Sequence, residues 1–144
     1  MPTSITMVSF FALFRSPLGS VKVLNSIGSK CLSGAGRLHG SRDRVALPIS
    51  GDNPKAKETV AQLIDRIGFD SVDAGTIAES WRQQPGSPPY CTNPTKEELQ
   101  SWLKKVDRSS LVTKREKALK AYLAVVDADW QAQVEAHRSV NVAF

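Results

Sequence analysis

The sequence has 144 residues, of which 41% are hydrophobic and 23% are charged, with a net charge of +5. This composition excludes a disordered or collagen-like chain and predicts a folded domain with a core of its own. Two cysteines, Cys31 and Cys91, are too few for a disulfide scaffold, and we expect free thiols in a cytoplasmic setting. No pair of residues has zinc-ligand spacing, so we predict no metal site.

The positive charge is concentrated in residues 1–50, which hold six Lys or Arg against one acid. These basic residues are scattered without interleaved aromatics, so a solvated surface is favoured over nucleic-acid binding. The apolar run at residues 5–14 is too short to span a bilayer and lacks the preceding charge of a signal peptide. We expect a buried strand or helix there, or a tail outside the fold, and we treat residues 1–18 as an atypical N-terminal segment.

Two short β-type runs come next in the chain, at residues 21–24 and 45–49. Residues 26–33 are expected to form a short helix between them. Pro48 lies in the second run and cannot donate a backbone hydrogen bond. That strand is therefore predicted at a sheet edge, or to end near the proline.

A strand–helix–strand unit is predicted from residue 45 onward. Asn53 is a good N-cap and Pro54 suits the first helical turn. Apolar residues at helical spacing follow, and Gly68 ends the helix. A strand at residues 69–73 completes the unit, which favours parallel pairing with the strand before the helix.

Three Thr-x-x-Glu patterns predict helix starts with capping boxes, at Thr76, Thr95 and Thr113. The first helix is expected to be short because Pro85 follows. Residues 85–94 contain four prolines and are predicted to be a connector without a helix.

Residues 93–144 are predicted to be a helical tail. The last helix is expected to run for about twenty residues and to continue its apolar face to Trp130. His137 lies near its end, where a cation would meet the negative end of the helix dipole.

The glycines Gly34, Gly36 and Gly40 invite comparison with a dinucleotide-binding turn. Their spacing is one residue too long, and they neither follow a strand nor open a helix. We therefore interpret the stretch as a loop.

Several residues capable of chemistry are better explained structurally. Cys31 and Cys91 have no base nearby in the sequence and are expected to be inert. The carboxylates of Asp52, Asp70 and Asp73 are expected to be solvated or capping groups rather than a catalytic pair.

The most site-like polar cluster is Trp81–Gln84, just beyond the predicted strand at residues 69–73. Ligands of open α/β sheets bind at the carboxyl ends of strands. Arg82 can pair with a phosphate or carboxylate, and Trp81 offers a flat face for stacking. The alternative is an amphipathic helix that packs Trp81 and leaves its polar side in water.

Three segments in order, residues 21–28, 46–52 and 68–75, resemble the deazaflavin-dependent NADP oxidoreductase family. The resemblance covers residues 19–92, and the stretch 80–86 looks like one bacterial subgroup. It implies an α/β fold, namely the C-terminal part of a Rossmann-like parallel sheet, followed by the helical tail.

The same resemblance implies hydride transfer between NADP and a deazaflavin or another small acceptor. Four residues would lie near NADP: Asn25, Ser26, Ile27 and Gly28. Three would lie on the acceptor side: Thr76, Trp81 and Arg82. The family relies on the redox chemistry of its cofactors, so no catalytic side chain is assigned.

In that family a half-domain with a glycine-rich turn precedes the segment that residues 21–28 resemble. Only about 20 residues precede it here, too few for a βαβ unit. We therefore expect a truncated reductase with weak or no activity. The alternative is a non-enzymatic interaction module, which binds another protein or a second copy as a homodimer through an exposed sheet edge or the apolar helical stripes.

Overall fold

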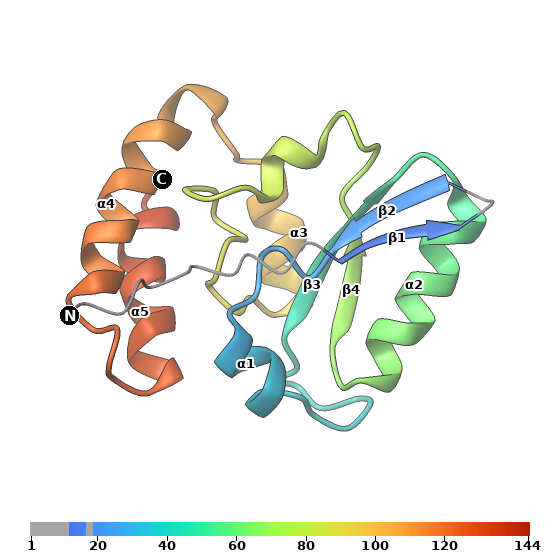
Figure 1. Cartoon of the computed structure of the whole chain (residues 1–144), viewed down its shortest axis with the longest axis horizontal. Helices are drawn as coiled ribbons and strands as arrows, with labels where there is room; N and C mark the ends of the chain where they lie inside the picture. The colour runs from blue at the N-terminus through green and yellow to red at the C-terminus, as the bar shows by residue number, and fades with distance from the viewer. Residues whose placement is uncertain (1–11, 17–18) are drawn as a thin grey trace, which may run out of the picture.

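The computed structural model describes residues 12–16 and 19–144, and it is a mixed α/β fold (Figure 1). One four-stranded sheet has the order β1-β2-β3-β4, with bounds Ala12–Ser16, Gly19–Val23, Ala46–Gly51 and Asp70–Asp73. The first two pairings are antiparallel and the third is parallel. Of the predicted N-terminal segment, β1 joins the sheet, whereas residues 1–11 and 17–18 lie outside the described residues.

The predicted parallel unit is confirmed for β3, α2 (Pro54–Arg66) and β4. The Asn53 side chain accepts hydrogen bonds from the N–H groups of Lys55 and Ala56, at 2.9 and 3.2 Å. Gly68 follows the helix with a φ of 100°, a value that favours glycine. The expectation of a wholly parallel sheet is wrong, because β2 runs antiparallel to β3.

The strand with Pro48 is central, not at an edge as predicted. β2 pairs with β3 only at Gly51 and Ser50, so its ladder ends before the proline is reached. On the other side, Val45 and Ile49 accept hydrogen bonds from β4. Because alternate residues point to alternate sides, the missing N–H of Pro48 faces the side where no ladder requires it.

Each face of the sheet has its own apolar cluster. The larger cluster lies against α2 and includes Leu47, Ile49, Val60 and Ile64. On the other face, residues of β3 and β4 pack with Leu99 of α3 (Lys96–Leu103). In Figure 1 the sheet accordingly lies between α2 and α3. This packing fixes α3 beside β4.

The helix starts are predicted with mixed success. Thr95 forms the expected capping box at the start of α3. The box predicted at Thr113 is wrong, because that residue lies within α4 (Leu111–Leu123) after a short turn, η2 (Arg108–Ser110). The predicted helix of about twenty residues is also wrong, because α4 ends at Leu123 and a separate helix, α5 (Trp130–Asn141), follows. Asp129 caps α5 through the N–H of Ala132 at 2.9 Å.

The segment at residues 85–94 contains no helix, as predicted, and it anchors α5. Arg138 donates from Nε to the carbonyl of Thr92 at 2.8 Å and pairs with Glu98 of α3 at 2.9 Å. Asn141 donates to the carbonyl of Tyr90 at 3.0 Å. The helical tail is therefore tied to the rest of the fold.

The prediction that His137 acts as a cation at a helix end is wrong. The side chain is buried between Tyr90 and Tyr122, with ring centroids 6.0 and 5.5 Å away. Burial lowers the pKa of His137 to about 4, so the imidazole is neutral at neutral pH.

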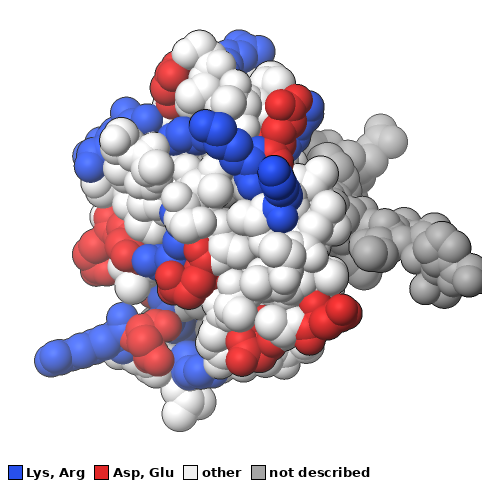
Figure 2. Space-filling model, turned by 90° about the vertical axis from the view of Figure 1, so that its left-hand side faces the viewer, with Lys and Arg blue, Asp and Glu red and all other residues white. Residues whose placement is uncertain are grey.

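The face formed by α4 and α5 carries charges of both signs (Figure 2). Acidic side chains lie among the basic ones there, which differs from the continuous basic surface typical of nucleic-acid binding. Among the described helices, none is long and apolar enough to cross a bilayer.

Candidate functional site

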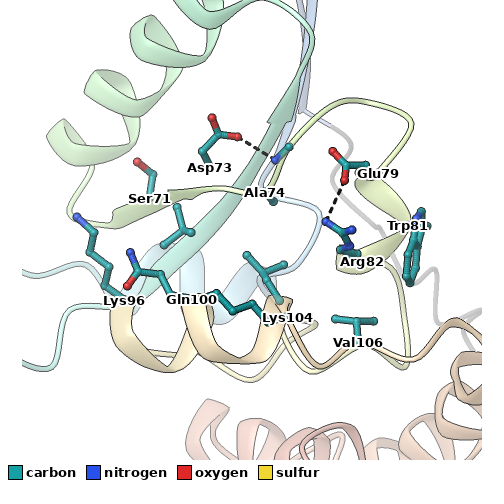
Figure 3. A pocket seen from close by; sticks show the side chains of 13 residues that line it. Ser71, Asp73, Ala74, Glu79, Trp81, Arg82, Lys96, Gln100, Lys104 and Val106 are labelled. Carbon is teal, nitrogen blue, oxygen red and sulfur yellow. Dashed lines mark hydrogen bonds and ion pairs between the residues drawn. The ribbon is translucent and has the colours of Figure 1, made fainter.

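A groove of about 930 Å³ runs along β4, the edge strand of the sheet (Figure 3). Residues 71–75 form one side, and Lys96, Gln100 and Lys104 of α3 and its C-terminal end form the other. Trp81 and Arg82 of η1 (Ser80–Gln83) lie at the end nearest the carboxyl end of β4. The sequence placed the latter two at a site, and both line this groove.

The Trp81 indole has two arginines over its ring. The guanidinium carbon of Arg82 is 5.5 Å from the ring centroid and that of Arg108 is 5.4 Å away. Arg82 also pairs with Glu79, with a nitrogen–oxygen distance of 3.1 Å. Arg82 lines the groove together with Trp81, whereas Arg108 does not. This end of the groove therefore combines an aromatic ring with one guanidinium, which suits a planar ligand that carries an acid group.

Glu79 shapes the turn that leads to η1. Its carboxylate accepts hydrogen bonds from the N–H and hydroxyl of Thr76, at 3.0 and 3.3 Å. The backbone hydrogen bond from Thr76, with the charge of Arg82, lowers the pKa of Glu79. Only this half of the predicted capping box forms, and no α-helix begins at Thr76. Thr76 bonds within the turn and does not line the groove.

Asp73 is engaged on the α2 side of the groove. Lys57 binds its carboxylate at 2.7 and 2.8 Å, and the N–H of Gly75 donates to it at 2.9 Å. Burial alone would raise the pKa of Asp73, but these hydrogen bonds outweigh it and the pKa is lowered. Both acids of the groove thus have cationic partners, and Lys96 and Lys104 are exposed along it.

None of the four residues predicted to contact NADP lines the groove, and one of them, Asn25, contacts η1. Asn25, Ser26 and Ile27 are buried, and Gly28 precedes α1 (Ser29–Gly34). The side-chain amide of Asn25 donates to the Gln83 carbonyl at 2.8 Å. The residues predicted near NADP and those predicted near the acceptor are therefore connected through η1. The residues predicted near NADP are largely buried and do not reach the groove.

Gln83 belongs to the predicted polar cluster Trp81–Gln84, where its amide is expected to donate and accept hydrogen bonds, but the residue is buried. Its side chain is fully buried and donates to the Ser50 hydroxyl at 2.7 Å. Gln83 thus ties η1 to the end of β3 and positions the Trp81 end of the groove. Because Gln83 lies between the polar residues Arg82 and Gln84, nothing in the sequence indicates that it is buried.

The two thiols are free, as predicted, and neither is activated. Burial raises the pKa of Cys31 and raises that of Cys91 to about 12. Thiols at these pKa values are protonated at neutral pH and are poor nucleophiles. His39 lies elsewhere and contacts Asp65 at 2.9 Å.

Gly36 and Gly40 lie in a loop between α1 and β3, as predicted, whereas Gly34 is the last residue of α1. A Cβ on Gly68 would lie 2.9 Å from Cα of Gly36, so this glycine serves close backbone packing. Asp52 accepts from the N–H of Ile77 at 3.1 Å, so it holds the turn that precedes η1 rather than capping a helix. In the described part of the chain, no group of three or more His, Cys, Asp or Glu could hold a metal ion.

Comparison with known proteins gives one short similarity. The protein YjhV of Escherichia coli (strain K12) is 52% identical to this chain over 52 residues. The matched part is 36% of this chain and 38% of YjhV, so the chain spans well under half of that relative. No family model and no solved structure matches the chain.

Proposed function

We propose that this chain forms the acceptor side of an NADP-dependent reductase, with β3, α2 and β4 as part of a Rossmann-type sheet. The resemblance of three ordered segments to the deazaflavin-dependent family supports this proposal. The observation that carries it is the groove at the carboxyl end of β4, where Trp81 and Arg82 lie together. That edge is where open α/β sheets bind ligands.

The proposal concerns the acceptor, because the described residues do not fit a dinucleotide. A pyrophosphate needs free backbone N–H groups where a strand leads into a helix. The glycine stretch leads from the end of α1 into β3, and Asn25 and Ser26 are buried, with Asn25 bonded to η1. We derive no hydride-transfer step from these residues and assign them the binding and orientation of a planar acceptor.

The groove predicts a measurable preference for a planar anion. Flavin mononucleotide combines a flat ring with a phosphate, and we expect it to quench Trp81 fluorescence with a saturable curve. Arg82→Gln removes a charged donor beside the ring and should weaken binding about ten-fold. Arg66→Gln, on the exposed last turn of α2, is the matched control and should bind as the natural chain does.

The same fluorescence titration tests the dinucleotide side of the proposal. NADPH should bind with a Kd above about 1 mM, since no described residues form a phosphate-binding turn. Saturation at low micromolar NADPH, or flavin quenching that Arg82→Gln leaves unchanged, would show that the assignment is wrong.

A further inference from the structure

The outer edge of β4 has the properties of a docking site for another strand. Among the residues that the structure describes, β4 pairs only with β3. Asp70 and Ala74 donate their N–H groups to Val45 and Ile49 of that neighbouring segment. Since alternate residues point to opposite sides, the backbone groups of Ser71 and Asp73 face away from β3, along the groove.

The charge along this edge indicates the chemistry of a partner. Asp73 and Glu79 are already paired with Lys57 and Arg82. Lys96 and Lys104 lie along the side of the groove formed by α3 and its C-terminal end, both exposed (Figure 3). A strand added to β4 would therefore pass close to two positive side chains.

A second copy of this chain fits the edge poorly. Pairing β4 with β4 of another copy would bring Lys96 and Lys104 of both chains together, and edge lysines are a common device against such self-pairing. An acidic segment meets the same lysines favourably. Charge complementarity thus favours an acidic segment over a second copy of this chain at the β4 edge.

We propose that the β4 edge binds an extended acidic peptide segment by strand addition. The backbone N–H and C=O groups of Ser71 and Asp73 pair with the peptide, and Lys96 and Lys104 receive its acidic side chains. This goes beyond the proposed acceptor binding, which uses the Trp81 end of the groove. It also gives a specific form to the alternative of an interaction module.

The test uses the full chain and a fluorescein-labelled peptide of about eight residues that alternates glutamate with threonine. Fluorescence anisotropy should show binding at least about ten-fold tighter than for a matched lysine–threonine peptide. A glutamate peptide that is N-methylated at alternate residues keeps its charge but loses donors, and it should bind about ten-fold more weakly. Equal binding of the methylated peptide, or no binding of the glutamate peptide, overturns the proposal.

Variants of the chain test whether the peptide binds at the β4 edge. Ser71→Pro removes an N–H that faces away from β3, so the β3–β4 ladder stays intact while peptide binding falls about ten-fold. Should this variant fail to fold, the double variant Lys96→Glu, Lys104→Glu serves the same purpose, with Lys117→Glu on α4 as the matched control. Unchanged binding in the double variant would overturn the proposal.

Two further measurements distinguish this proposal from acceptor binding and from self-association. Flavin mononucleotide should still quench Trp81 in Ser71→Pro, so failure of either proposal is visible without the other. Size-exclusion chromatography should give a monomer whose elution does not change with concentration. A dimer that Lys96→Glu, Lys104→Glu strengthens would assign the edge to a second copy and overturn the acidic partner.

Discussion

Replacing Arg44 by methionine should cost about 3 kcal/mol of the free energy of unfolding, the upper end of the range for a hydrogen bond to a charged group, because several such bonds are lost while the acids remain in reach of solvent. The Arg44 side chain is 1% exposed and lies between two acids, with Nη1 2.5 Å from Asp65 and 2.8 Å from Asp70. Nη2 donates to the backbone carbonyl of Asp65 at 2.6 Å. One guanidinium therefore joins the end of α2 to the start of β4.

Urea unfolding of matched variants measures this effect. Arg37 lies in the same loop but is exposed and 3.7 Å from Asp43, so Arg37→Met should cost less than about 1 kcal/mol. Arg44→Lys keeps the charge without the forked donors and should fall between the two. Equal stability of Arg44→Met and Arg37→Met would show that the pairs of the buried Arg44 side chain add nothing beyond a surface pair.

The parts of the fold that could be predicted from sequence have local signals. Asn53 and Gly68 bound α2, and Thr95 opens α3, because a cap is decided within a few residues. The direction of β2 has no such signal. Its antiparallel pairing depends on how the segment between β2 and β3 returns the chain to the sheet, which is a tertiary property.

In the candidate site, too, some residues could be predicted from local sequence signals and others could not. Trp81 and Arg82 follow a recognisable strand, so their place at its carboxyl end could be predicted. Lys96 and Lys104 reach the groove only because Leu99 packs α3 against Val72. Asn25 also follows a strand, yet it is buried and bonded to Gln83 of η1, and no local pattern in the sequence indicates that contact.

His137 should make stability fall on mild acidification. The folded chain holds the imidazole neutral, with its pKa lowered to about 4 by burial, whereas an unfolded histidine has a pKa of about 6.5. Below that value the unfolded chain binds a proton that the folded chain does not. The stabilising contribution is therefore complete above about pH 6.5 and declines until the pH reaches the folded pKa.

Between about pH 7 and pH 5 this linkage predicts a loss of about 2 kcal/mol, measured as the change in the free energy of urea unfolding. His137→Phe keeps an aromatic ring between Tyr90 and Tyr122 but cannot titrate. Its stability should be nearly level over this range, where most carboxylates remain ionised in both states. The exposed His39 is present in both proteins and cancels in the comparison. An equal slope in both would mean that the imidazole takes up its proton without leaving the aromatic pair.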